Sequence, residues 1–461
     1  MWERYGFYVV QSLLALYLAL HFKWPDDQIY ALVGSFTALT YLSPVAGGWI
    51  ADQLLGQKRT VLIGAICLFL SYLSLTLFNS HLMLVGALAG VAVGTGMLKP
   101  NISSLLGNEY PIDSPKRESG FTIFYMGITS GIILGTTLPS LLTHFLGWSF
   151  TFFSAALGMI VAFIVFVYGI RRFNLQDYYP FQYHPIKIIK AMVTMLALWI
   201  TSFVILEYSK IADIALILVA LLSLLFFINT IRREQGKQAK QTLVIVLLCI
   251  ISIMFWAFYF QMFLSWTLFI SRVVEPSLLG FNFPPPYYVS IQSLGMIAFG
   301  YFLSKHMPPL NSIQRGLRTG NKFVLSMVIM TLAYALVTLV AFKGKNTYLL
   351  SPFYVIPAYL FISIAELLLS PVGLSAITLL ASRKKVSTMM GIFFVSLGLG
   401  GFLSGKLATL TSVKSTDLPI HLMKLHYAET FQELFIILVI ATIICFFLNG
   451  LIRHLLLSSE K

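Results

Sequence analysis

Long apolar segments follow one another along almost the whole chain, and their length constrains the fold more than any other feature. A helix needs about 20 mostly apolar residues to cross a bilayer, where its backbone hydrogen bonds must all be made internally. Fourteen segments fit that description: 5–22, 29–50, 60–78, 82–105, 120–144, 148–170, 187–207, 212–231, 242–270, 286–304, 322–342, 350–381, 387–410 and 432–457. Only 10% of the 461 residues are charged, whereas soluble domains carry about 25%. We therefore predict an all-α polytopic membrane protein with fourteen spans.

The formal net charge of +14 includes short basic clusters between the apolar segments. These clusters are Lys58-Arg59, Lys116-Arg117, Arg171-Arg172, Arg232-Arg233 and Arg383-Lys384-Lys385. An even number of predicted spans precedes each cluster, so all five fall on one side of the membrane, and the positive-inside rule makes that side cytoplasmic. We expect both termini in the cytoplasm and a location in the inner (plasma) membrane. The charge then reflects topology in a lipid bilayer and does not indicate nucleic-acid binding.

No motif in the sequence predicts an enzyme, a metal site or a bound cofactor. Cys67, Cys249 and Cys445 each lie in an apolar segment and are too far apart for a metal-ligand motif. The patterns His-Glu-x-x-His and Gly-x-Ser-x-Gly do not occur. A nutrient sensor would be expected to carry a sizeable soluble domain, and no segment between the spans is long enough for one. These observations favour a transporter.

Two charged residues, Lys99 and Glu366, lie well inside apolar segments. A charge at mid-membrane depth costs roughly 2.5–3.5 kcal/mol on insertion scales, so such residues usually line a pathway or pair with a partner. Pro100 follows Lys99, and Pro371 follows Ser370, which lies one helical turn after Glu366. Because proline weakens a helix, we predict broken helices at matching positions of two halves, as at the midplane site of secondary transporters. Lys99 and Glu366 would face one central cavity from opposite halves.

The segment between the second and third predicted spans carries a motif of glycines and charges. It reads Gly48-Trp-Ile-Ala-Asp52-Gln-Leu-Leu-Gly56-Gln-Lys58-Arg59. Glycine permits a tight turn, and the Asp can cap a helix or pair with a cation. The pattern resembles the loop signature of the major facilitator superfamily, in which Gly-x-x-x-Asp-x-x-x-Gly precedes basic residues. The resemblance implies the major facilitator fold, which has two six-helix bundles.

Four other segments resemble the proton-dependent oligopeptide transporter family, and the resemblance covers nearly the whole chain. They are Trp2-Glu3-Arg4-Tyr5-Gly6-Phe7-Tyr8, Gly94-Thr-Gly-Met-Leu-Lys99-Pro100-Asn101-Ile-Ser, Phe121-Thr-Ile-Phe-Tyr125-Met-Gly-Ile128 and Glu366-Leu-Leu-Leu-Ser370-Pro371-Val-Gly-Leu-Ser375. The Lys-Pro-Asn and Phe-Tyr-x-x-Ile motifs are specific to that family. The resemblance implies a secondary active transporter that takes up dipeptides and tripeptides with protons by alternating access. It also implies two extra helices at 173–238 between bundles at 1–172 and 239–461, and we expect a monomer.

The resemblance further implies which residues bind the substrate and the proton. The substrate-binding residues would be Arg4, Tyr8, Gln11, Tyr41, Lys99, Thr129, Trp256, Gln292, Glu366 and Ser370. Lys99 and Arg4 would serve the carboxylate of a peptide and Glu366 its ammonium, since a zwitterion needs opposite charges at its two ends. Glu3, Arg4 and Lys99 would couple transport to protons, with Glu3 as the proton carrier and no other cofactor.

The sequence departs from the family at positions tied to proton coupling. Only Glu3-Arg4 represent the family's Glu-x-x-Glu-Arg motif. Gln11 stands where many members have a second arginine, and Phe260 where many have a proton-linked glutamate. Thr129 and Gln292 each replace an asparagine. These departures leave a second hypothesis open, in which the chain transports a non-peptide zwitterion or exchanges substrates with weakened proton coupling.

Simpler structural roles also remain open for several of these residues. Glu3 and Arg4 could form an ion pair within one helix at a membrane interface, where charges are tolerated. Tyr8 and Tyr41 could be interface-belt or packing aromatics. Lys99 and Glu366 are harder to explain in this way, because both lie deep in apolar segments.

Overall fold

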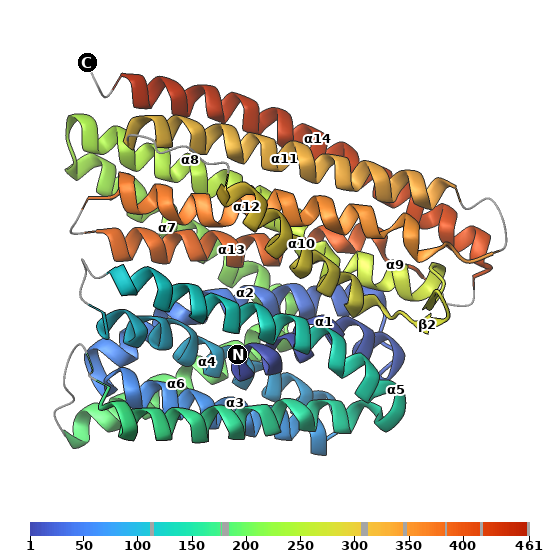
Figure 1. The fold of residues 1–461 in the computed structure, drawn as a ribbon, viewed down its shortest axis with the longest axis horizontal. Helices are drawn as coiled ribbons and strands as arrows, with labels where there is room; N and C mark the ends of the chain where they lie inside the picture. Colours follow the sequence, from blue (N-terminus) through green and yellow to red (C-terminus); the bar gives the residue numbers. More distant parts are fainter. Residues whose placement is uncertain are drawn as a thin grey trace. The chain divides into compact units, whose positions relative to one another are not determined.

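The computed structural model describes residues 1–110, 115–175, 177, 184–305, 312–343, 348–382, 385–414 and 418–458, and nearly all of these residues are helical (Figure 1). The helices are α1 (Trp2–Leu20), α2 (Asp26–Ile50), α3 (Gln57–Leu77), α4 (His81–Asn108), α5 (Pro115–Phe173), α6 (Pro185–Glu207), α7 (Ser209–Arg233), α8 (Gly236–Tyr259), α9 (Ser265–Val273), α10 (Pro285–Lys305), α11 (Ser312–Phe342), α12 (Ile356–Leu380), α13 (Val386–Ala408) and α14 (Ile420–Leu457).

Short elements connect some of these helices. A π-helical segment (Ala51–Leu55) follows α2, and 3-10 helices occupy Phe260–Phe263, Pro352–Tyr354 and Thr409–Thr411. Two-residue strands, β1 (Ser277–Leu278) and β2 (Phe281–Asn282), form an antiparallel pair with Ser277 opposite Asn282 and Leu278 opposite Phe281.

Most helices coincide with the segments predicted from apolar length, which confirms the all-α prediction, but the segment 242–270 is divided into α8, a 3-10 helix and α9. The segments 120–144 and 148–170 both belong to α5, whose backbone is non-helical at Gly147 (φ 82°, ψ 177°). Within the described residues, eleven helices are long and apolar enough to cross a membrane; α5 counts once, and α1 and α10 are not among them. The count of fourteen spans therefore stays a prediction.

The predicted helix breaks at Pro100 and Pro371 are wrong, because α4 and α12 run through these prolines without interruption. A proline removes one backbone hydrogen bond, but side chains and neighbouring helices can satisfy the freed groups. In α4 the side-chain amide of Asn101 donates to the Met97 carbonyl (2.6 Å) and to the Gly47 carbonyl of α2 (3.2 Å). The Gly47 bond attaches α4 to α2 next to Lys99 and Pro100, and neither acceptor is the Gly96 carbonyl that Pro100 leaves without its usual donor.

The chain divides into two compact units that do not follow the order of the sequence. Unit 1 consists of Met1–Tyr17 and Ser35–Ala212, and unit 2 of Leu18–Gly34 and Asp213–Lys461. The end of α1 and the start of α2 thus group with the C-terminal half of the chain. The division into bundles at 1–172 and 239–461 with inserted helices at 173–238 stays a prediction.

In unit 1, close helix packing depends on glycines that bring backbones together. A Cβ atom at Gly47 of α2 would lie 2.0 Å from the Gly96 carbonyl oxygen of α4, and a Cβ at Gly96 would lie 2.6 Å from the Ser43 Cβ. The Ser43 hydroxyl donates to the Ala92 carbonyl (2.7 Å) across the same contact. The α2–α4 crossing therefore tolerates no larger residue at these two glycines, and it positions Tyr41 and Lys99.

In unit 2, α11 packs against both α12 and α14, while α8 packs against α13. A Cβ at Gly34, near the start of α2, would lie 2.7 Å from the Gly405 Cα of α13. A Cβ at Gly400 would lie 2.5 Å from the Trp256 Cβ of α8. Here too, glycines permit the helices to approach closely, and the α8–α13 contact positions Trp256.

The helices α6 and α7 attach to different units. In unit 1 the indole of Trp199 on α6 donates to the Gly86 carbonyl of α4 (3.0 Å). In unit 2 Asp213 of α7 pairs with Lys406 of α13 (2.6 Å). Both helices expose large apolar side chains, such as Val193 (61% exposed) and Leu222 (64% exposed), as lipid contact requires.

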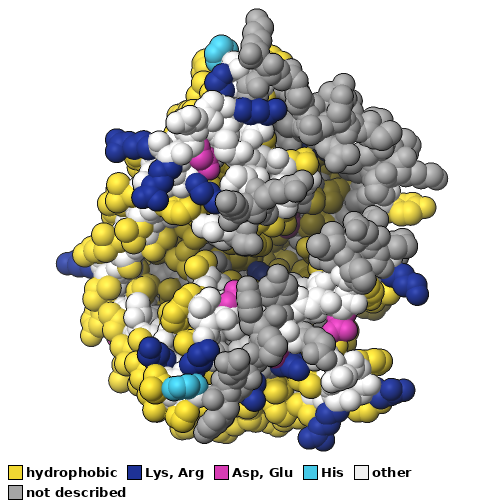
Figure 2. Space-filling view, turned by 90° about the vertical axis from the view of Figure 1, so that its left-hand side faces the viewer, with side chains coloured by type: hydrophobic (Ala, Val, Ile, Leu, Met, Phe, Trp, Pro, Cys, Tyr) yellow, Lys and Arg dark blue, Asp and Glu magenta, His cyan; other side chains and the backbone are white. Residues whose placement is uncertain are grey.

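Basic side chains lie at the surface that Figure 2 shows. Figure 2 views the end at which α14 terminates, and it shows Lys and Arg side chains more often than Asp and Glu. Of the basic clusters predicted to be cytoplasmic, the side chains of Arg117, Arg383 and Lys384 lie outside the described residues. The orientation of this end in the membrane stays a prediction.

Candidate functional site

Lys99 of α4 lies over the ring of Tyr41 of α2 within unit 1, with its Nζ 4.6 Å from the ring centroid. An ammonium over an aromatic face gains about 0.5–2 kcal/mol without losing its charge. No carboxylate pairs with Lys99 in the part of the chain that the structure describes. The arrangement leaves an ammonium group whose charge an anionic ligand can neutralise.

Glu3 and Arg4 form a buried ion pair at the start of α1. The Nε and Nη2 atoms of Arg4 donate to the two carboxylate oxygens of Glu3, and both residues are less than a tenth exposed. The Arg4 guanidinium also lies 4.8 Å from the centroid of the Phe7 ring. Because the partners are adjacent in sequence, this pair belongs to one helix, and both interpretations of these residues include it.

Three of the predicted residues, Arg4, Tyr8 and Gln11, follow one face of α1 at helical spacing. The Gln11 amide donates to the Thr37 hydroxyl of α2 (3.1 Å), while its Oε1 is buried without a hydrogen-bond partner. Leaving a buried acceptor unpaired costs about 1–3 kcal/mol. Gln11 therefore offers an oxygen that a donor from a ligand could satisfy.

The α5 backbone packs closely on this region of α1. A Cβ at Gly131 would lie 2.4 Å from the Met1 carbonyl oxygen, and a Cβ at Gly135 would lie 2.7 Å from the Tyr5 carbonyl oxygen. Thr129, which the resemblance placed among the substrate-binding residues, donates its hydroxyl to the Tyr125 carbonyl of its own helix (3.1 Å). The hydroxyl of Thr129 therefore already donates a hydrogen bond within its own helix.

Unit 2 brings together three of the predicted residues: Trp256, Gln292 and Glu366. The Gln292 Nε2 of α10 donates to the Glu366 Oε2 of α12 (2.7 Å). The Tyr259 hydroxyl of α8 donates to the same oxygen (2.8 Å), and the Trp256 ring lies edge-on to Tyr259 with 4.6 Å between centroids. Ser370 lies one turn after Glu366 and is partly buried.

The structure therefore assembles the predicted residues in two sets, one in each unit. Arg4, Tyr8, Gln11, Tyr41, Lys99 and Thr129 belong to unit 1, and Trp256, Gln292, Glu366 and Ser370 belong to unit 2. A shared cavity for Lys99 and Glu366 stays a prediction.

The glycines and Asp of the loop motif differ from the expected geometry. Gly48 lies inside α2, and a Cβ there would meet open space, so Gly48 makes no turn. Asp52 lies in the π-helical segment and neither caps a helix nor pairs with a cation of the described chain. Gly56 alone makes the turn, with φ 79° and ψ 157° between the π-helical segment and α3.

The basic pair of the loop motif follows that turn. Asp177, which the sequence analysis did not identify, accepts the backbone N–H of Lys58 at the start of α3 (2.9 Å), where a negative charge is favourable. The Lys58 Nζ donates to the Leu175 carbonyl (2.8 Å). Arg59 is exposed.

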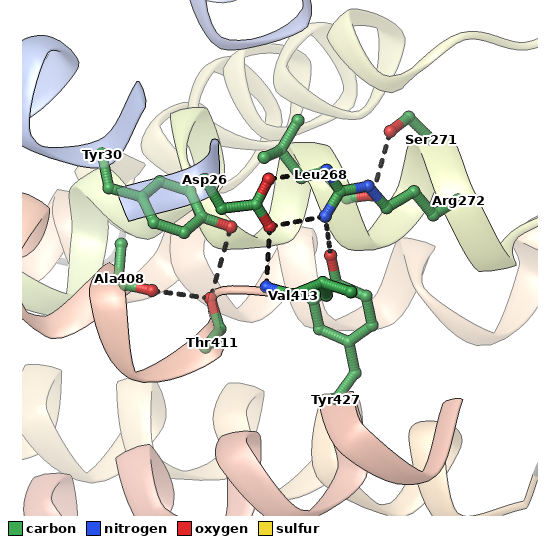
Figure 3. Close-up of polar contacts among 9 residues, drawn as sticks. All are labelled: Asp26, Tyr30, Leu268, Ser271, Arg272, Ala408, Thr411, Val413 and Tyr427. Atoms are coloured by element: carbon green, nitrogen blue, oxygen red, sulfur yellow. Dashed lines mark hydrogen bonds and ion pairs between the residues drawn. The ribbon is translucent and has the colours of Figure 1, made fainter. Parts of the chain in front are cut away.

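A second buried ion pair, also missed from the sequence, connects Asp26 of α2 with Arg272 of α9 in unit 2 (Figure 3). Two guanidinium nitrogens of Arg272 each donate to one Asp26 oxygen at 2.7 Å. Arg272 also donates to the Tyr427 hydroxyl (2.8 Å), and the backbone N–H of Val413 donates to Asp26 (3.0 Å). The network attaches the start of α2 to α9, α14 and the segment after α13.

No group of three or more His, Cys, Asp and Glu side chains in the described ranges could hold a metal ion. The charged side chains at the two sets of residues suit binding of charged groups and proton transfer, and no nucleophile–base pair is present among them.

Comparisons with known proteins match this chain to one family of proteins. The model of the POT family matches residues 58–425. Dipeptide and tripeptide permease B of Edwardsiella piscicida is 29% identical over 423 residues, covering 90% of this chain and 85% of the relative. The permease of the same name from Xenorhabdus bovienii is 27% identical and covers 100% of this chain and 95% of the relative.

Solved structures show the same fold. One, from work on substrate recognition in proton dependent oligopeptide transporters, is 25% identical, with a TM-score of 0.83 over 98% of this chain and 97% of that chain. A crystal structure of tetrameric PepTSo2, at 24% identity, matches with a TM-score of 0.85 over 98% and 96%. The predicted major facilitator fold is confirmed. Because the family model also covers well over half of the sequence, this chain belongs to the POT family.

Proposed function

We propose that the protein is a secondary active transporter that takes up dipeptides and tripeptides together with protons by alternating access. The observation that carries the proposal is the pair of uncompensated charges: the Lys99 ammonium in unit 1 and the Glu366 carboxylate in unit 2. Neither has an oppositely charged partner among the described side chains. A zwitterionic peptide supplies both missing charges, and relatives named dipeptide and tripeptide permease support this substrate class.

The other residues take supporting roles in this proposal. Tyr8, Gln11, Tyr41 and Thr129 of unit 1 contribute to binding the peptide backbone, and the unpaired Gln11 Oε1 accepts a peptide N–H. Trp256, Gln292 and Ser370 of unit 2 contribute to binding the ammonium end. The loop motif (Gly48, Asp52, Gly56, Lys58 and Arg59) contributes to the change between conformations, with Gly56 as its turn.

Proton coupling is assigned to Glu3, Arg4 and Lys99. Glu3 carries the proton, and its carboxylate changes partner between Arg4, as here, and Lys99. The driving force is about 2.3 kcal/mol per charge per 100 mV, plus about 1.4 kcal/mol per pH unit. One proton therefore supports more than tenfold accumulation.

A second candidate, exchange with weakened proton coupling, rests on one departure from the family pattern. By resemblance, Phe260 stands where many members have a proton-linked glutamate, and its ring lies 5.4 Å from the Trp256 and Tyr259 centroids. A phenylalanine side chain can neither bind nor release a proton at that position. We place either transporter in the inner membrane as a monomer, with both termini in the cytoplasm and no cofactor besides the proton.

The test is uptake of labelled dialanine into proteoliposomes, with and without an inward proton gradient. We expect accumulation that depends on the gradient and that Lys99→Ala reduces at least tenfold. Counterflow without accumulation would support the exchanger, and absence of both binding and uptake would contradict a peptide substrate.

A further inference from the structure

The Glu366 carboxylate is held at one oxygen only. The Tyr259 hydroxyl and the Gln292 amide donate to Oε2 at 2.8 and 2.7 Å, from α8 and α10 respectively. These distances are typical of strong hydrogen bonds to a carboxylate. Because the two donors come from different helices, rotation of the carboxylate would break both bonds.

The other oxygen, Oε1, receives no hydrogen bond from any residue within the described ranges. The Glu366 side chain is partly exposed, and neither of its two donors carries a positive charge. A carboxylate in an apolar helix is costly unless a cation neutralises it. Oε1 is thus the atom at which a ligand can supply that cation.

Aromatic packing fixes the position of the Tyr259 hydroxyl. The Tyr259 ring lies edge-on to Trp256, with centroids 4.6 Å apart, and edge-on to Phe260 at 5.4 Å. It also stacks on Phe255 at 5.9 Å. A tyrosine has only two side-chain torsions, and three neighbouring rings restrict both of them. The hydroxyl is therefore directed at Glu366 before any ligand arrives.

We propose that Tyr259 is a positioning residue for peptide recognition. Together with Gln292 it holds Oε2 of Glu366, and it thereby presents Oε1 to the α-ammonium of the peptide. Gln292 then acts through Glu366 instead of contacting the peptide. The proposal rests on the proposed function, since it refines how the ammonium end of the substrate is recognised.

The test compares two ligands in proteoliposomes containing the full chain. Dialanine carries the α-ammonium, and propionyl-alanine is the same molecule without it. We expect Tyr259→Phe to raise the KM for labelled dialanine about tenfold, because a hydrogen bond to a charged group is lost. The maximal rate and the inhibition constant of propionyl-alanine should stay within about twofold of wild type.

A double variant separates positioning from packing. Glu366→Gln removes the charge, so adding Tyr259→Phe to it should raise the KM for dialanine no further. Tyr334→Phe is the matched control, because its buried hydroxyl donates to the Phe258 carbonyl (2.8 Å) and not to Glu366. This control should leave the ratio of dialanine to propionyl-alanine affinity unchanged.

Gln292→Met removes the other hydrogen bond to Glu366 Oε2 without changing the aromatic cluster. It should lower the affinity for dialanine relative to propionyl-alanine, and this test remains if Tyr259→Phe fails to fold. Two outcomes in a protein that still transports dialanine would overturn the proposal. One is an equal loss of affinity for both ligands in Tyr259→Phe, and the other is a rise in KM that adds to the effect of Glu366→Gln. A wild-type protein that neither binds nor transports dialanine would instead refute the proposed function.

Discussion

The ion pairs Glu3–Arg4 and Asp26–Arg272 are both buried, yet they connect very different parts of the chain. Glu3 and Arg4 are neighbours in one helix, with side chains 11% and 9% exposed. Asp26 and Arg272 are 246 residues apart, with side chains 3% and 13% exposed, and two further hydrogen bonds complete their network. A third pair, Lys406–Asp213, is 42% and 39% exposed.

This comparison separates pairs that maintain tertiary structure from pairs that can change partners. Opening the Asp26–Arg272 pair removes an attachment between α2 and α9 and separates two buried charges. Opening the Glu3–Arg4 pair removes an ion pair within one helix. The local pair is therefore the better candidate for exchange of a proton or a partner during transport.

The largest effect is expected for Arg272→Ala, which leaves Asp26 buried without its cation. Removing one partner of a buried pair costs about 3–5 kcal/mol, so the melting temperature of the purified protein should fall strongly. The double variant Asp26→Asn/Arg272→Gln should recover most of that loss, because no charge is left unpaired. Equal instability of the single and double variants would show that the ion pair is not what attaches α2.

An intermediate effect on stability is expected for Glu3→Gln, which keeps an acceptor for Arg4. Loss of the charge should cost about 1–2 kcal/mol of unfolding free energy. Uptake driven by the proton gradient should be lost, while counterflow of dialanine across the membrane should persist. If gradient-driven uptake survives in Glu3→Gln, the proton carrier is another residue.

The smallest effect is expected for Asp213→Asn at the exposed pair with Lys406. Exposed ion pairs contribute about 0–1 kcal/mol and are screened by salt. The melting temperature should change little, and any change should disappear in high salt. A loss as large as that of Arg272→Ala would mean that the attachment of α7 to α13 is essential for unit 2.

The elements of this fold could be read from the sequence because membrane helices depend on local properties. Each apolar segment had to be long enough to satisfy its backbone internally, and most helices coincide with those segments. Prolines misled the prediction, because α4 continues through Pro100 although proline removes one backbone hydrogen bond there. The helix propensity of a segment does not account for contacts with neighbouring helices.

The candidate site could be identified only in part. Lys99 and Glu366 stand out because charges are rare in apolar segments, so their position alone indicates function. Tyr259 has no such signal, since one tyrosine in an aromatic run resembles any packing residue. Asp177 and Arg272 likewise lie 119 and 246 residues from the groups they bind.

The sequence by itself determined the helices, the membrane class, the family motifs and the two charges at the candidate site, because each depends on residues near one another in the chain. Only the tertiary structure decided which donors hold Glu366, which carboxylate binds the start of α3, and how α2 is attached through Asp26. Hydrogen bonds and ion pairs act over about 3 Å, so these partners are defined only when distant helices pack against one another.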